Sequence, residues 1–282
     1  MALILEETAE AISSFLGAKL NDIAISRAVF GLFFSGVKLS TGHGGLCYTP
    51  VKDLPEAVCC PSQVRAMPLS GQLSGRPAAS YLDDVFGTNV LKKTLGIAVL
   101  NALSELCLED PACQEKHALQ YETLYHADAF DVMEFPKGSK VVVIGALAPM
   151  LKRLLRDGHD FTVLELDPRT LKGAELEHFL PVSKTDTIVP GADALVITGT
   201  TLLNNTLDHI LSLKRPGAQA LVTGPTASML PGAFFAHGVT MLGGIRVTNP
   251  DDALDIISEA GSGYHLFGRS AERTVIDRRQ IT

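Results

Sequence analysis

The sequence contains no tryptophan, and aromatic residues make up only 6% of it, which disfavours a surface on which bases or sugar rings stack. Basic residues are not in excess either, because 24 Lys and Arg stand against 31 Asp and Glu, for a net charge of −7. Since binding to phosphates requires a basic face, this balance argues against a nucleic-acid partner. No apolar run reaches the ~18 residues of a membrane-spanning helix, so we expect no membrane partner.

Cysteine is scarce and follows no pattern. The chain has five cysteines and no CxxC pair, which argues against both a disulfide framework and a four-cysteine zinc site. The first residues carry Glu6, Glu7 and Glu10 where a secretion signal needs a basic flank and an apolar core. We therefore expect a cytoplasmic protein with reduced thiols.

Familiar catalytic motifs are missing as well. We find no GxSxG, no phosphate-binding Walker loop, no HExxH and no paired-carboxylate motif. The sequence therefore assigns no nucleophile or general base, and it leaves open whether the protein is an enzyme.

The first half of the chain predicts an α+β unit. Residues 3–18 have apolar side chains at helical spacing, and residues 21–50 are rich in Val, Ile and Phe between glycines, which predicts two or three antiparallel strands. Residues 95–106 are apolar nearly all round, which predicts a buried helix. Strands followed by helices are typical of an α+β domain.

The second half alternates between short apolar strands and helices. We predict strands in KVVVIGALAP, FTVLELDP, ADALVITGTT, AQALVTGPT and GVTMLGGIRVTNP, and helices in MLKRLLRDG, TLLNNTLDHILSL and DDALDIISEA. This spacing is typical of βαβ crossovers, and it predicts an open parallel sheet, Rossmann-like in architecture. With the boundary near residues 128–138, the chain divides into an N-terminal α+β domain (1–130) and a C-terminal α/β domain (131–282).

The candidate ligand-binding residues follow the predicted strands. In an open α/β sheet, ligands bind beyond the carboxyl ends of the strands. The residues at those ends are Gly145, Glu165, Asp167, Thr198, Thr200, Thr201, Gly224 and Thr226, with Asn204 in the helix that follows TGTT. Of Asn204 and its neighbour Asn205, we expect one to face the crevice or a neighbouring element. A purely structural interpretation remains open, because glycine allows turns and threonine caps helices.

The first βα turn resembles a dinucleotide-binding turn only in part. Glu165 follows Gly145 by 20 residues, about where a ribose-binding acid stands. However, the turn reads GALAPM and lacks the second and third glycines that allow close approach to a pyrophosphate. This disfavours NAD or FAD and favours a nucleoside-like or S-adenosylmethionine-like ligand over them.

A metal-binding hypothesis comes from TGHGGLCYTP. His43 and Cys47 are ligand types that suit a soft divalent metal, and Glu165 is a third candidate ligand. Two ligands do not complete a structural zinc site, so a turn histidine and a buried thiol are the alternative. Cys59 and Cys60 precede Pro61 in a predicted loop, where neighbouring thiols point opposite ways.

Several segments together resemble a known family. LGIAVLNALS, LELDP, ADALVITGTTLLNNT, LVTGPTASMLPGAFFAHGV and MLGGIRVTNPDDAL resemble the "putative heavy-metal chelation" family, whose function is unknown. GLFFSGVKLSTGHGGLCYTP resembles the enolase-N-terminal-like domain that accompanies it. The resemblance implies an enolase-N-like domain packed on a Rossmann-like domain, with a site between them.

Three functions follow as hypotheses. The first is a cleft that binds a divalent or heavy metal ion or a metal-bearing small molecule, in cofactor biosynthesis or metal transport as the resemblance implies. The second is an enzyme that acts on a nucleotide-like or S-adenosylmethionine-like small molecule. The third is a non-catalytic partner protein. A homo-oligomer is compatible with all three.

Overall fold

The computed structural model describes residues 2–54, 66–118 and 120–278, which form a mixed α/β fold with two sheets. The small sheet is antiparallel, with its strands in chain order: β1 (Ile25–Phe30), β2 (Phe34–Leu39) and β3 (Gly44–Tyr48). The large sheet has eight strands, in the order β4 (Glu122–Tyr125), β11 (Ala271–Asp277), β10 (Met241–Val247), β9 (Gln219–Thr223), β8 (Ala194–Thr198), β5 (Val141–Ile144), β6 (Phe161–Glu165) and β7 (Phe179–Pro181).

Six neighbouring strands of this sheet are parallel, namely β10, β9, β8, β5, β6 and β7. The strands β11 and β4 are antiparallel additions at the edge next to β10. The chain starts this parallel set at β5, moves outward to β6 and β7, and then returns to add β8, β9 and β10 on the other side of β5. The direction of winding therefore reverses between β5 and β8. The carboxyl ends of the strands beside such a reversal are the usual ligand position in open α/β sheets.

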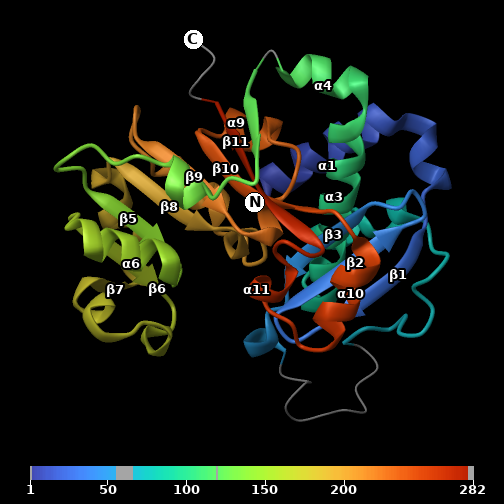
Figure 1. The fold of residues 1–282 in the computed structure, drawn as a ribbon, viewed down its shortest axis with the longest axis horizontal. Helices are drawn as coiled ribbons and strands as arrows, with labels where there is room; N and C mark the ends of the chain where they lie inside the picture. Colours follow the sequence, from blue (N-terminus) through green and yellow to red (C-terminus); the bar gives the residue numbers. More distant parts are fainter. Residues whose placement is uncertain (1, 55–65, 119, 279–282) are drawn as a thin grey trace.

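The helices cover both sheets (Figure 1). They are α1 (Leu3–Leu16), α3 (Val90–Glu109), α4 (Pro111–Ala118), α5 (Ala129–Val132), α6 (Ala148–Asp157), α7 (Thr185–Ile188), α8 (Leu207–Ser212), α9 (Gly232–Ala236), α10 (Pro250–Ser258) and α11 (Gly263–Leu266). None of the helices in the described ranges is long and apolar enough to cross a membrane.

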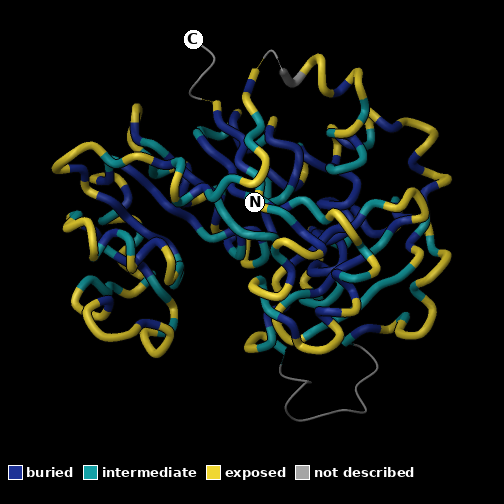
Figure 2. The backbone as a smooth tube through the Cα atoms, viewed as in Figure 1, coloured by how far each residue is buried: buried dark blue, intermediate teal, exposed yellow. Residues whose placement is uncertain are grey.

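The small sheet lies between two helices. Alternate residues of β2 and β3 face α3 on one side, Val37 and Cys47 among them, while Phe34 and Leu46 face α10 on the other. All residues of α3 from Lys93 to Ser104 are buried, so the helix runs through the interior (Figure 2). The predicted buried helix is therefore confirmed, and it places polar side chains as well as apolar ones inside the protein.

The two parts of the chain exchange elements. β4 precedes residue 130 in sequence but pairs with β11 in the large sheet, whereas α10 lies between β10 and β11 in sequence but packs on β1 and β2. One hydrophobic cluster extends from Ile4 and Leu95 to Val142 and Ile197 of the large sheet. The two sheets thus share a core.

Most of the predicted elements are confirmed. The antiparallel strands in residues 21–50 are present, as are β5, β6, β8, β9 and β10, and α6 ends at Gly158, which has φ +67°. The continuous helix predicted for TLLNNTLDHILSL is wrong in its first half. A 3-10 turn, η9 (Gly199–Leu202), comes first, and α8 begins only at Leu207, because Asn205 takes a left-handed conformation with φ +58°.

Candidate functional site

The candidate site is the region at the carboxyl ends of β5, β6, β8 and β9, where the turn that follows β9 contacts β3 and α3. We call it the strand-end region. Direct hydrogen bonds connect its two sides: the Tyr48 amide donates to Thr226 Oγ1 at 3.1 Å. Asn101 Nδ2 of α3 donates to the carbonyl oxygens of Leu46 at 2.7 Å and of Pro225 at 3.0 Å. The short turn η10 (Pro225–Ala227) is thereby fixed against the small sheet.

The predicted residues after β5 and β8 lie side by side. A side chain on Gly145, which has φ +95°, would come within 2.7 Å of Thr198 Cγ2. The lack of a side chain at Gly145 therefore lets the two turns pack together. Thr201 Oγ1 donates to the Thr198 carbonyl oxygen at 2.7 Å, and Thr200 Oγ1 donates to Thr198 Oγ1 at 3.2 Å. These hydroxyls hold the turn that their own backbone forms.

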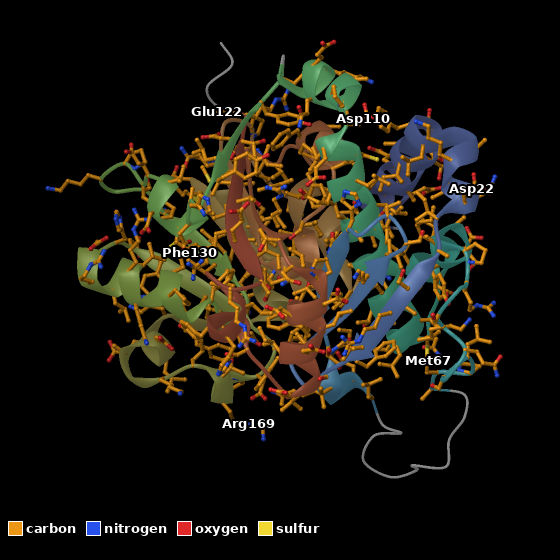
Figure 3. The ribbon with its side chains drawn as sticks, turned by 45° about the vertical axis from the view of Figure 1, so that its right-hand side comes forward. Asp22, Met67, Asp110, Glu122, Phe130 and Arg169 are labelled. Atoms are coloured by element: carbon orange, nitrogen blue, oxygen red, sulfur yellow. The ribbon has the colours of Figure 1, made fainter. Side chains whose placement is uncertain are left out.

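The predicted acids after β6 have different surroundings. Glu165 Oε1 accepts from the amides of Leu166 at 2.7 Å and Asp167 at 3.1 Å, so this carboxylate folds over its own turn. Asp167 accepts from Arg169 through two nitrogens and from Lys52 Nζ at 2.8 Å. The Arg169 guanidinium, with Lys52 second, holds the pKa of Asp167 far below its usual range. Figure 3 labels Arg169.

His43 and Cys47 are not brought together. They lie at opposite ends of β3, about 13 Å apart at the usual strand rise of ~3.3 Å per residue. His43 Nε2 contacts Glu109 Oε2 at 3.1 Å, and Glu109 Oε1 also accepts from Arg246 at 2.7 Å. Cys47 is fully buried against α3, and this burial raises the pKa of its thiol far above the usual range. Cys47 also belongs to no group of three or more His, Cys, Asp or Glu side chains in the described part of the chain.

Sequence reasoning missed one functional candidate, Lys93. Its partner is Asn205, which the sequence offered as the alternative to Asn204. Lys93 is only 4% exposed, and its Nζ donates to Asn205 Oδ1 at 2.5 Å. Burial lowers the pKa of Lys93. The signal in the sequence was a lysine two residues before the apolar run LGIAVLNALSEL, at a position that a buried helix would carry inward. Asn204, which was predicted, instead bonds locally to Thr206.

The remaining predicted residues are accounted for by the backbone. Gly224 has φ +120°, which favours glycine, and its amide donates to the Gly243 carbonyl oxygen at 2.8 Å.

Within the described ranges, no group of three or more His, Cys, Asp or Glu side chains could hold a metal ion. Cys59 and Cys60 lie outside the described residues.

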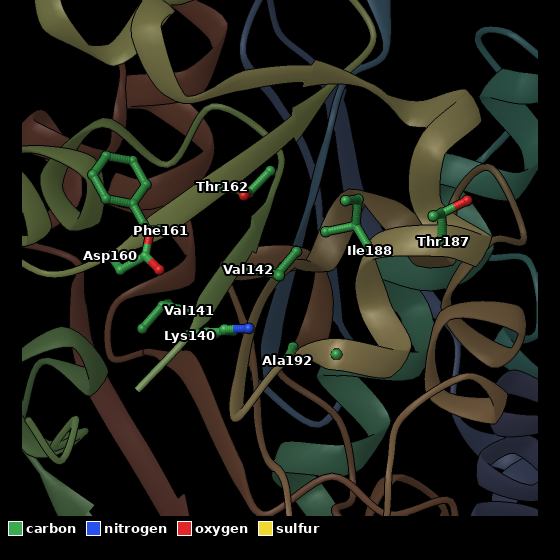
Figure 4. A pocket seen from close by; sticks show the side chains of 10 residues that line it. Lys140, Val141, Val142, Asp160, Phe161, Thr162, Thr187, Ile188 and Ala192 are labelled. Atoms are coloured by element: carbon green, nitrogen blue, oxygen red, sulfur yellow. The ribbon is translucent and has the colours of Figure 1, made fainter. Parts of the chain in front are cut away.

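A surface hollow lies at the other end of the strands of the large sheet, where β5 and β6 begin (Figure 4). It has a volume of about 240 Å³ and is bordered by residues at the amino ends of β5 and β6, including Lys140, Asp160 and Thr162. None of the predicted site residues lines this hollow. It is therefore separate from the strand-end region.

Comparison with known proteins places the chain in a family. The sequence profile described as "Putative heavy-metal chelation" matches residues 128–276, and a second profile with the same description matches residues 14–104. The chain belongs to this family. The resemblance inferred from the sequence is thereby confirmed.

The similarity to known proteins extends over nearly the whole chain. An uncharacterized protein of Methanocaldococcus jannaschii is 25% identical over 279 residues, which are 97% of this chain and 98% of that protein. A family protein of unknown function from Pyrococcus horikoshii has a TM-score of 0.74 at 19% identity, covering 97% of this chain and 99% of that one. Another, from Desulfitobacterium hafniense, has a TM-score of 0.70 at 21% identity, covering 96% and 99%. These two likenesses show the fold.

Proposed function

We propose that the protein binds a metal-bearing small molecule in the strand-end region. The family description supports the metal, and the position at the winding reversal of the parallel sheet supports a bound ligand. We further infer that residues 131–282 are a Rossmann-like domain and residues 1–130 an enolase-N-terminal-like domain, with the ligand between them.

The observation that carries the proposal is the set of polar side chains that both parts of the chain bury at this junction. Lys93, Asn101 and Thr226 are at most 4% exposed, although polar side chains are rarely buried without a specific role. Asn101 Nδ2 already donates to backbone carbonyl oxygens, so the Lys93 ammonium and the Thr226 hydroxyl are the donors left, and these suit the oxygen atoms of an organic chelator better than a bare cation.

The protein's own contribution to the metal would come from Glu165. The turn uses Oε1 of Glu165, which leaves Oε2 for a metal. Asp167 is already paired with Arg169 and Lys52, and Cys47 is fully buried. One carboxylate with chelator oxygens would complete the ligand set of a divalent ion. The role is binding, and we assign no reaction to it.

The test is metal-dependent stability. Melting temperatures would be measured with Co²⁺, Ni²⁺ or Zn²⁺, each alone and as its citrate complex, for the wild type and Glu165→Gln. The proposal expects the citrate complex to raise the melting temperature of the wild type more than citrate alone does, and this additional shift to be smaller in the variant. Glu177→Gln, at an exposed position of η6 (Gly173–His178), is the matched control. If no metal or complex shifts any melting temperature, the proposal is wrong.

A second candidate is a nucleoside-like or S-adenosylmethionine-like ligand at the same place. The observation in its favour is that Gly145 and Glu165 stand at the carboxyl ends of the neighbouring strands β5 and β6, beside the winding reversal. Nucleosides, which carry neither a metal nor an acidic group, would then raise the melting temperature. The metal-chelate proposal expects no such shift.

A further inference from the structure

Lys93 is a buried cation with no buried anion beside it. Its only hydrogen-bond partner in the described part of the chain is the uncharged amide oxygen of Asn205, and it forms no ion pair there. The neighbouring Lys92, by contrast, reaches Asp84 Oδ1 at 3.4 Å and is half-buried. An ammonium that leaves water without a countercharge destabilises the fold, so such an arrangement usually serves a function.

The other groups around Lys93 are neutral as well. Cys47 is close enough to interact with it electrostatically, and burial raises the pKa of its thiol, which therefore keeps its proton. Among the residues that the structure describes, the surroundings thus supply a positive charge, an amide and a thiol, and no carboxylate pairs with Lys93. This is the complement of an anionic oxygen group.

Asn205 covers the ammonium from the solvent side. It is exposed, whereas Lys93 beneath it is buried, and it stands in the short connection between η9 and α8 at the carboxyl end of β8. Its left-handed conformation, φ +58°, presents the amide to Lys93. A rotation of this one exposed side chain would open the ammonium to a ligand in the strand-end region.

We propose that Lys93 anchors an anionic oxygen group, a carboxylate or a phosphate, of the small molecule, and that this group takes the place of the Asn205 amide. The inference rests on the proposed function for the rest of the ligand and deepens it, because it requires a chelator or other small molecule with a free acidic group. Lys93 is a binding residue in this proposal, with no role in a reaction.

The experiment uses citrate and inorganic phosphate as probes, in metal-depleted buffer at constant ionic strength. We expect either probe to raise the melting temperature of the wild type by about 5 °C near saturation. Lys93→Met keeps the length of the side chain without its charge and should abolish the shift. In Lys92→Met, on the same helix, the probes should raise the melting temperature as much as in the wild type. Because these anions also stabilise proteins generally, the difference between the two variants is the informative quantity.

A second variant keeps Lys93 and supplies the anion. Asn205→Asp places a carboxylate at the ammonium, so it should melt higher than the wild type without any probe and should no longer respond to citrate or phosphate. An undiminished shift in either Lys93→Met or Asn205→Asp would overturn the inference, as would a wild type that responds to neither probe. A response to citrate alone identifies a carboxylate as the group, and a response to phosphate alone identifies a phosphate.

The metal arm separates this inference from the proposed function. If Co²⁺ or its citrate complex shifts the wild type and Lys93→Met equally, the metal-chelate function stands and the anchor at Lys93 is wrong. If the response to metal-free anions depends on Lys93 while no metal has any effect, the anchor stands and the metal is wrong.

Discussion

The Lys52 ammonium and the Asp167 carboxylate form an ion pair at 2.8 Å between positions far apart in sequence. Lys52 lies in η2 (Val51–Asp53), just after β3, and Asp167 lies in the turn after β6. The pair therefore connects the end of the small sheet to the acidic turn of the large one. Arg169 holds the same carboxylate from its own turn.

We expect Lys52→Met to raise the pKa of Asp167, and Arg169→Met to raise it more, because Arg169 makes the larger contribution. A lowered carboxyl pKa stabilises the fold at pH values above the ordinary value of ~3.9, and this stabilisation is lost as the pH falls toward the folded-state pKa. Both variants should therefore show a smaller acid-dependent loss of stability. Carboxyl ¹³C titration by NMR measures the pKa directly, and an unchanged Asp167 curve in Arg169→Met would contradict the assignment.

The Cys47 thiol should make the protein sensitive to alkaline pH. Burial raises its pKa, so the folded state keeps a proton that the unfolded chain releases above ~8.5. The free energy of unfolding should therefore fall as the pH rises above this value, by about 1.4 kcal/mol per pH unit from this group.

Urea unfolding of Cys47→Ala at several pH values between 8 and 10 tests this. The variant should lose stability at pH 7 but show a shallower decline at higher pH than the wild type. Cys107→Ala provides a comparison, since burial raises the pKa of Cys107 to about 12. Equal alkaline slopes in the wild type and Cys47→Ala would show that the thiol titrates normally.

Arg246 neutralises three carboxylates at once. It reaches Glu105 at 2.9 Å, Glu109 at 2.7 Å and Glu272 at 3.4 Å. Burial raises the pKa of Glu105, and Arg246 opposes that effect. Arg246→Met should therefore raise this pKa further and reduce stability at pH 7 by about 2 kcal/mol, a value discounted for partial exposure.

The pH dependence distinguishes this explanation from a simple packing loss. When the pKa of a carboxyl group is raised in the folded state, the free energy of unfolding falls as the pH rises from the ordinary pKa of ~4.3 toward the raised one. The loss of stability in Arg246→Met should therefore be smaller at pH 5 than at pH 7. Arg27→Met, which removes an exposed pair with Asp255, should cost less than ~1 kcal/mol at either pH. A deficit of the same size at pH 5 and pH 7 would indicate packing alone.

Gly45 controls how closely β3 approaches α3. A side chain there would lie 2.1 Å from the Ala98 carbonyl oxygen and 2.5 Å from the Ala102 nitrogen. Because backbone atoms cannot move aside cheaply, Gly45→Ala should destabilise the protein by about 3 kcal/mol or more. Gly191→Ala, which meets nothing within 4 Å, is the control and should be nearly neutral. Thermal or urea unfolding decides, and a neutral Gly45→Ala would show that the two elements can separate.

Local pattern predicted much of the fold. The apolar strands β5, β6, β8, β9 and β10, the helix ending at Gly158 and the buried helix around Leu95 all have signals within about a dozen residues. Three strands were missed, β4, β7 and β11, since β7 is only three residues long and the other two are antiparallel additions at the far edge. Their pairing depends on neighbours that are distant in sequence.

By itself the sequence determined which residues stand at the ends of strands, because apolar periodicity and turn residues act locally. Only the tertiary structure decided which of them meet. It separated His43 from Cys47 along one strand, engaged Asp167 with Lys52 and Arg169, and brought Lys93 to Asn205. The physical reason is that burial and charge pairing are properties of the packed molecule, and the packing places a lysine of α3 beneath the connection after β8.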